Sequence, residues 1–261
     1  MLCGLTACTL NTVSRAAKPA GFTEILRLDT DIAIEKVCYN SIEQVTYIWE
    51  ANTEEIHVFE QDIHTNTVGG TGFDRTNFQK LADICLSPDG DLFALDSIER
   101  SLKKFDKKGD LIAKIQMDNN LNPQLVAIAL DQKIYIYDDR RKEIVVLNYK
   151  GKEIETFGSL QFNEPVCLEL YHDLLAVYDR ENEFTMFFSR FGQIIDQQQG
   201  HCYIDNQQVY CAKNFFLEHL AETHKYAINT IPWQKVFFQS PEIILIDGKK
   251  ILVGMIKYES Y

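Results

Sequence analysis

The chain has 261 residues, enough for one large all-β domain or two small ones. A hydrophobic share of 46% excludes a disordered or collagen-like chain, and no run of about eighteen apolar residues exists to span a membrane. The net charge is −12, from 26 Lys and Arg against 38 Asp and Glu, and no long basic cluster is present. A polyanion needs a basic face, so we do not expect nucleic acid as a partner.

Near the N-terminus stands Leu5-Thr6-Ala7-Cys8, which resembles the lipobox of bacterial lipoproteins. In that motif the Cys becomes the lipidated first residue of the mature protein. The resemblance implies lipidation at Cys8, with residues 1–21 as a truncated signal and tether and residues 22–261 as the folded domain. Only seven residues precede Cys8, with no charged segment and a short apolar core. Either the true start lies upstream, or Cys8 is an ordinary thiol of a cytoplasmic protein.

The next hydrophobic segment, Phe22–Leu28, stands alone before the repeats begin. It reads as a strand without a unit of its own. We expect it to pair with the last unit of the chain and to close a ring, because closure removes the exposed strand edges that invite aggregation.

A strand pattern then recurs along the chain. Each copy reads as an inner strand, a turn, a second strand that ends in an acid, a polar turn, a third strand, a Gly turn and a fourth strand. The acids are Glu50, Asp96, Asp138 and Asp179. Four strands repeated roughly every 40–46 residues are typical of the blade of a β-propeller.

The segment from Gly69-Gly-Thr-Gly72 to Ile84–Asp96 resembles a junction between NHL repeats, and the resemblance extends over about Val45–Ile195. It implies an all-β propeller of four-stranded antiparallel blades. Further hairpins in Tyr203–Cys211 and Ile243–Ile256 bring the expected number of blades to six, with five as the runner-up. The segment Phe215–Ala221 has helical character and is expected to be a short insertion.

The four repeated acids invite interpretation as a metal site. Each of them, however, comes just past a strand, where a carboxylate accepts backbone N–H bonds and stabilises a turn. A residue that every blade requires is part of the blade. We therefore predict a structural role for Glu50, Asp96, Asp138 and Asp179.

The cysteines of the inner strands are also expected to be structural. Cys38, Cys85 and Cys167 occupy matching positions, and Ala127 takes that position in the remaining repeat, so the position requires a small buried group. No Cys-x-x-Cys or His/Cys cluster has zinc-ligand spacing, and we expect neither a metal nor a cofactor.

Cys202 and Cys211 differ from the other cysteines. They face each other across a hairpin if its turn is centred on Asn206-Gln207. A disulfide can then form in an oxidising compartment, although we slightly favour two free thiols.

No nucleophile motif stands in the sequence, so we expect no catalytic residue. The first hypothesis is a monomeric, non-catalytic binding or scaffold propeller that docks a protein or polymer partner. It would be held by a lipid on the periplasmic face of a bacterial envelope, with a cytoplasmic location as the alternative. The second hypothesis is a metal-dependent, lactonase-like hydrolase, whose divalent cation would lie in the central channel between Glu, Asp and Asn ligands. Glu169 and Asn40 are the inner-strand residues that could point inward.

Overall fold

A computed structural model describes residues 19–205, 208–213, 216–219, 225–227, 233–239 and 241–258. Cys8 and the rest of the expected signal and tether lie outside the described residues. Within the described ranges, all elements are β-strands. None of the described residues forms a helix that is long and apolar enough to cross a lipid bilayer.

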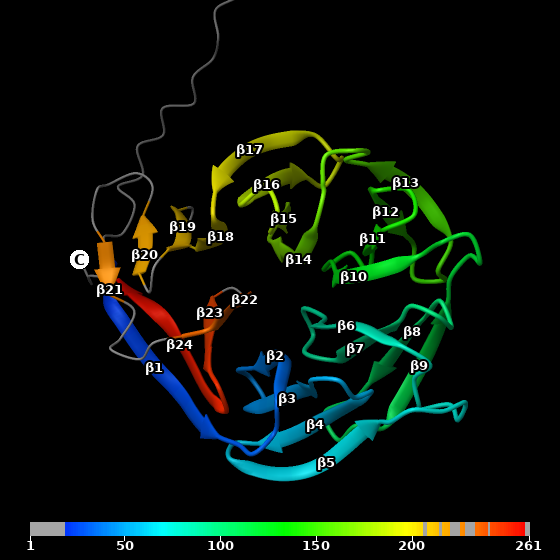
Figure 1. The fold of residues 1–261 in the computed structure, drawn as a ribbon, viewed down its shortest axis with the longest axis horizontal. Coiled ribbons are helices and arrows are strands. Elements are labelled where there is room, and N and C mark those ends of the chain that lie inside the picture. Colours follow the sequence, from blue (N-terminus) through cyan, green and yellow to red (C-terminus); the bar gives the residue numbers. More distant parts are fainter. Residues whose placement is uncertain are drawn as a thin grey trace, which may run out of the picture.

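The strands form six four-stranded antiparallel sheets arranged around a central axis (Figure 1). Four sheets take their strands consecutively from the chain: β2 (Ile34–Asn40), β3 (Val45–Glu50), β4 (Glu55–Glu60) and β5 (Ile63–Gly69); β6 (Leu81–Leu86), β7 (Leu92–Asp96), β8 (Ser101–Phe105) and β9 (Leu111–Gln116); β10 (Pro123–Ile128), β11 (Ile134–Asp138), β12 (Glu143–Leu147) and β13 (Glu153–Phe157); β14 (Pro165–Tyr171), β15 (Leu174–Asp179), β16 (Phe184–Ser189) and β17 (Ile194–Gln199). A fifth sheet joins β18 (His201–Asp205), β19 (Gln208–Lys213), β20 (Phe216–His219) and β21 (Lys225–Ala227), and the sixth joins β22 (Lys235–Gln239), β23 (Glu242–Asp247), β24 (Lys250–Tyr258) and β1 (Pro19–Asp29). The prediction of an all-β propeller of four-stranded antiparallel blades is confirmed.

The first strand closes the ring. β1 pairs antiparallel with β24, so one sheet contains both ends of the described chain (Figure 1). Phe22 lies opposite Ile256, and Leu28 lies opposite Ile251. The prediction that Phe22–Leu28 joins the last blade is confirmed.

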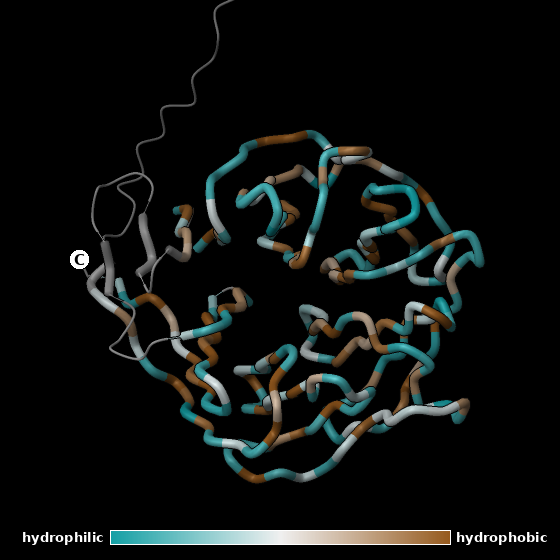
Figure 2. Tube along the Cα trace, in the orientation of Figure 1, coloured by the Kyte–Doolittle hydropathy of each residue, from teal (hydrophilic) through white to brown (hydrophobic). Residues whose placement is uncertain are grey.

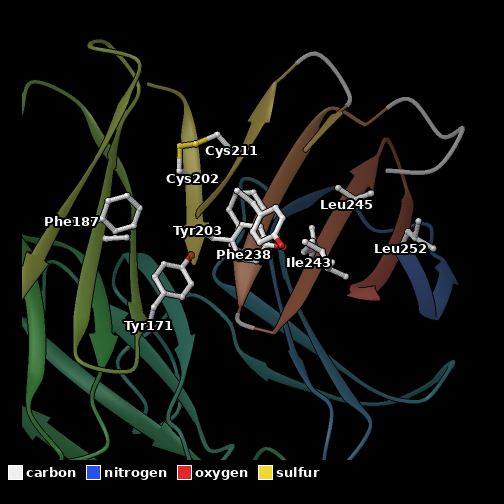
Figure 3. Close-up of a cluster of buried hydrophobic side chains, with 12 residues drawn as sticks. Tyr171, Phe187, Cys202, Tyr203, Cys211, Phe238, Ile243, Leu245 and Leu252 are labelled. Carbon is white, nitrogen blue, oxygen red and sulfur yellow. A yellow bond between two sulfur atoms is a disulfide. The ribbon is translucent and has the colours of Figure 1, made fainter. Parts of the chain in front are cut away.

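The hydrophobic core lies between neighbouring sheets. Tyr135 and Tyr137 of β11 pack in one buried cluster with Leu175 and Val177 of β15. Hydrophobic segments recur in every sheet (Figure 2). Where the last sheets meet, the rings of Tyr203 and Phe238 stack with centroids 4.3 Å apart (Figure 3). Each blade therefore buries its apolar faces against its neighbours, as a propeller requires.

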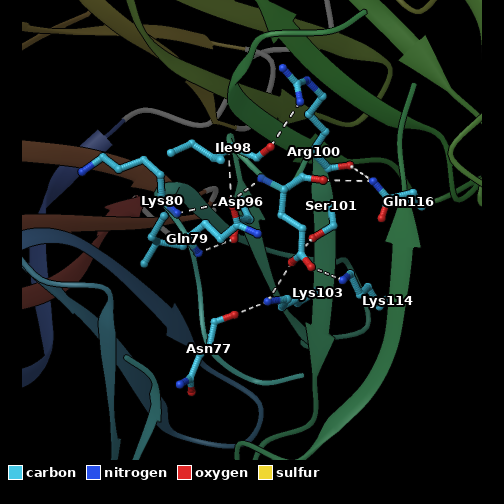
Figure 4. Close-up of polar contacts among 12 residues, drawn as sticks. Asn77, Gln79, Lys80, Asp96, Ile98, Arg100, Ser101, Lys103, Lys114 and Gln116 are labelled. Carbon is cyan, nitrogen blue, oxygen red and sulfur yellow. Dashed lines mark hydrogen bonds and ion pairs between the residues drawn. The ribbon is translucent and has the colours of Figure 1, made fainter. Parts of the chain in front are cut away.

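Three of the repeated acids bind the backbone at the start of their own blade. Asp96 is fully buried and accepts N–H bonds from Gln79, Lys80, Ile98 and Glu99 at 2.7–3.3 Å (Figure 4). Equivalent bonds reach the other two acids: Asp138 accepts from Asn122 and Arg140, and Asp179 accepts from Asn163, Glu164 and Asn182. Each carboxylate thereby links the residues that lead into the inner strand to the turn that follows the acid.

Glu50 departs from this pattern. Its carboxylate is partly exposed and lies 3.2 Å from Nε2 of His57 on the neighbouring strand. Glu has one methylene more than Asp, which carries the carboxylate past the short turn that the other three acids cap. The expected capping role of Glu50 is therefore wrong.

The segment Phe215–Ala221 is also corrected in part. Phe216–His219 forms strand β20 and pairs with β19 and β21, so these residues are not helical. The remaining residues of the segment lie outside the described ranges.

Replacing Asp96 by Ala should lower the free energy of unfolding by about 3 kcal/mol, because four partly buried N–H groups lose their acceptor. Urea unfolding followed by circular dichroism measures the change. Glu50→Ala is the matched control from the same repeat position, and it should cost less than about 1 kcal/mol. Equal losses in the two variants would contradict the capping assignment of Asp96.

Candidate functional site in the central channel

The inner strands of four blades share one irregularity in their pairing. In each, a register shift follows the first paired residue, and the residue after the shift pairs with the one preceding the blade's acid. These residues are Lys36, Asp83, Leu125 and Cys167. Two residues further along each strand stand Cys38, Cys85, Ala127 and Glu169, which form the next level of the channel.

Cys167 is therefore not at the level of Cys38 and Cys85, and the expected match is wrong. The turn between β14 and β15 is only His172-Asp173, whereas Ser87–Asp91 connects β6 to β7. A shorter turn shifts the pairing of the inner strand with the second strand, so residues at the same distance from the acid along the chain no longer lie at the same level. Glu169 takes the position that is Cys or Ala in the other three blades. A carboxylate in a position that otherwise holds a small group is a departure from the repeat, and such departures are expected at functional sites.

Lys36 and Asp83 form a buried ion pair at the first level. Lys36 Nζ lies 2.6 Å from Asp83 Oδ1, and Asp83 Oδ2 accepts the Val126 N–H at 2.9 Å. Burial acts to lower the pKa of Lys36, but the Asp83 carboxylate raises it above its ordinary value. The ammonium group is therefore charged and balanced, and the pair ties together three neighbouring blades.

Glu169 is surrounded by donors. Its Oε1 accepts from Cys167 Sγ at 2.9 Å and from the Phe238 N–H at 3.2 Å, and its Oε2 accepts from the Tyr171 hydroxyl. Burial raises the pKa of Glu169 to about 7, although the hydrogen bonds from Cys167 and Tyr171 act to lower it. The carboxyl group therefore exchanges its proton near neutral pH.

His201 completes the group from the next blade. Its Nε2 lies 3.8 Å from Glu169 Oε1 and is buried with no hydrogen-bond partner. The imidazole stacks on Tyr178 with centroids 4.6 Å apart, and it meets Phe238 edge-on at 4.7 Å. Burial, followed by the charge of Lys36, lowers the pKa of His201 to about 3. The ring is therefore neutral and held in one orientation.

Two cavities, of about 610 and 640 Å³, extend from this group. Lys36 and Phe237 line both of them. Glu169 lines the first cavity, whereas Cys167 and His201 line the second. Cys167, Glu169 and His201 thus lie where the two cavities meet. Cys167, Glu169 and His201 place S, O and N atoms within 4.8 Å of one another, which is close enough to hold one metal ion.

Asn40 lies in the first cavity, but its amide is already used. Its Oδ1 accepts the N–H groups of Ile42 and Glu43, and its Nδ2 donates to the Gly90 carbonyl. Asp83 is likewise engaged with Lys36. The lactonase hypothesis requires Glu, Asp and Asn side chains around one cation. In the channel, Glu169 is placed to bind one, whereas the side chains of Asn40 and Asp83 are already engaged.

The structure joins Cys202 and Cys211 by a disulfide, so our preference for free thiols was wrong. The two residues lie directly opposite each other in β18 and β19, and the register agrees with a turn centred on residues 206 and 207. The disulfide packs among Phe187, Tyr203 and Phe238 (Figure 3). The disulfide lies in the core between blades.

The repeated acids Asp96, Asp138 and Asp179 line neither of the two channel cavities.

Comparison with known proteins supports the fold. No protein-family model matches the chain, and no curated protein matches it. A gluconolactonase from Xanthomonas campestris is similar at a TM-score of 0.62 and 11% identity, over 88% of both chains. A virginiamycin B lyase from Staphylococcus aureus gives 0.59 and 12%, over 95% of this chain and 98% of that one. BBS1N in complex with ARL6DN gives 0.57 and 11%, over 92% and 98%. Such neighbours show a β-propeller and include both enzymes and a protein-binding domain.

Glu169→Gln should change how stability depends on pH. The folded pKa of about 7 lies above the ordinary 4.5, so the folded protein binds more protons between these values and loses stability as pH rises through them. Relative to the variant, the wild type should lose on the order of 3 kcal/mol between about pH 5 and about pH 8. Urea unfolding in metal-free buffer measures this, with the exposed Glu181→Gln as control. Parallel pH profiles for wild type and Glu169→Gln would refute it.

Proposed function

We propose that this protein is a binding or scaffold propeller that receives a protein partner at one mouth of its channel. The mouth lies at the turns that follow the inner strands β2, β6, β10 and β14. One observation carries the proposal: the cavity of about 610 Å³ is lined by Ile42 and Leu130, whose exposures are 83% and 81%. Large apolar side chains on loops around a cavity are typical of an interaction site.

The rim is built in advance of binding. Asn40 caps its own turn and bonds to Gly90 in the neighbouring blade, and the Gln239 side chain accepts the Tyr39 N–H at 3.0 Å. Turns that are tied to one another lose little conformational entropy when a partner docks. BBS1N, which shares the fold, was solved with a protein partner.

The proposal includes a six-bladed ring related to NHL repeats. Six four-stranded sheets support the number of blades. The register shift that recurs in four inner strands supports a common repeat, because a bulge is a feature that related units keep. The proposal also includes a monomer, since the first and last strands meet in one sheet and leave the ring closed.

The envelope location depends on Cys8, and the lipobox-like Leu5-Thr6-Ala7-Cys8 supports it. Expressed in a bacterial host, the mature chain should begin at Cys8 and carry a diacyl or triacyl group, which suffices for stable membrane attachment. Mass spectrometry of the N-terminus and membrane fractionation measure this, with Cys8→Ser expected in the soluble fraction. A soluble wild-type chain that starts at an unmodified Met1 would remove the anchor.

The mouth can be tested with two variants that carry the same chemical change. Ile42→Asp combined with Leu130→Asp places two charges at the rim and should reduce recovery of the partner roughly tenfold or more in affinity capture from the native organism. Ile112→Asp combined with Ile154→Asp places the same charges on the outer strands β9 and β13, where both residues are also exposed, and it should leave recovery unchanged. Equal recovery by both double variants would refute the mouth as the docking site.

A further inference from the structure

We propose that Cys167, Glu169 and His201 form a binding site for Zn²⁺ or a similar divalent transition metal. Cys167 and Glu169 come from β14, and His201 comes from β18 of the neighbouring blade. The inference concerns metal binding alone and does not depend on a partner at the channel mouth.

The distances suit a tetrahedral ion. Zinc binds S at about 2.3 Å and N or O at about 2.0–2.2 Å, so its ligand atoms stand roughly 3.3–3.6 Å apart. The observed separations are 2.9 Å from Cys167 Sγ to Glu169 Oε1 and 3.8 Å from that oxygen to His201 Nε2. Shifts of less than about 1 Å bring each of these two pairs to the separation expected for ligands of one ion.

The unpartnered nitrogen of His201 independently points to a ligand. A buried polar atom without a partner costs about 1–3 kcal/mol, so the Nε2 atom needs an explanation. The rings of Tyr178 and Phe238 fix the imidazole so that this nitrogen is directed at Glu169. A metal ion between them would satisfy the nitrogen without moving the ring.

Outer contacts already orient the carboxylate. The Tyr171 hydroxyl donates to Oε2 and the Phe238 N–H donates to Oε1. Metal-binding carboxylates are commonly held by such contacts, which fix the ligand before the metal arrives. Glu169 therefore has the supporting bonds of a ligand in a position where other blades carry only Cys or Ala.

The charges balance once a dication is bound. A Cys167 thiolate and a Glu169 carboxylate together neutralise Zn²⁺, while the nearby Lys36 and Asp83 neutralise each other. The thiol and imidazole donors favour zinc or cobalt over magnesium or calcium, which prefer oxygen ligands. The site thus differs from the oxygen-only site of the lactonase hypothesis.

The fourth coordination position faces the channel. Glu169 borders one cavity, and Cys167 and His201 border the other, so water or a small ligand can reach the ion. Three protein ligands with one open position are typical of zinc sites that bind or activate a small molecule, in contrast to closed structural sites.

The test uses the full chain with Cys3 and Cys8 replaced by Ser and with His57→Gln. These changes remove the two thiols of the N-terminal segment and disrupt the separate group Glu50, Glu55 and His57, which could also hold an ion. After chelation, the protein is titrated with Co²⁺ and Zn²⁺ without thiol reductants. We expect one equivalent of Co²⁺ with the absorption bands of thiolate-to-cobalt charge transfer and tetrahedral coordination, and a higher melting temperature with Zn²⁺.

The variants assign the ligands. Cys167→Ser should abolish the charge-transfer band, and His201→Gln and Glu169→Gln should each weaken binding roughly tenfold or more. Cys38→Ser is the matched control, since Cys38 is also a buried thiol of an inner strand. If Cys167→Ser fails to fold by circular dichroism, His201→Gln carries the assignment. The inference is overturned if the parent protein binds no stoichiometric metal, or if the band survives Cys167→Ser or vanishes equally in Cys38→Ser.

Discussion

The register of the inner strands is the constraint on which the channel depends. In each of four blades, one shift after the first paired residue sets how the inner strand pairs with its neighbour. Because side chains alternate along a strand, a slip by one residue would move every side chain of the inner strand to the opposite face of its blade. Asp96 and its equivalents bind backbone groups on both sides of the hairpin. These buried carboxylates therefore hold the register that places Glu169 in the channel.

The architecture could be predicted from the sequence because it repeats. Recurring strands and acids identify the blade, and the isolated Phe22–Leu28 segment identifies the closing strand, since a ring leaves no other free edge for it. The facing of Cys202 and Cys211 follows from simple hairpin arithmetic. The formation of the bond between them does not, because the sequence alone left both the exact turn and the redox state of the two thiols open.

The channel group could not be predicted as a group. Cys167 was placed at the wrong level because the β14–β15 turn is shorter than the others, and spacing from the acid is a reliable guide only where turn lengths are equal. Glu169 was visible as an inner-strand acid, whereas His201 begins a blade without the repeated acid, and so nothing aligned it with the others. The role of Glu50 could not be predicted for a related reason. Its position in the repeat matches that of the three Asp residues, but its longer side chain places the carboxylate beside His57.

The buried polar groups of the channel differ in how well they are satisfied, and this difference separates structure from function. Lys36 and Asp83 are paired with each other, and Asp83 also binds Val126, so they stabilise the contact between blades without an outside partner. Glu169 carries an unfavourable burial that raises its pKa to about 7, and His201 keeps an unpartnered nitrogen. Small residues at the level of Glu169 in three other blades show that the fold does not need a carboxylate there. A ligand that enters the channel and contacts both groups would offset this cost, and we therefore interpret the group as a binding site.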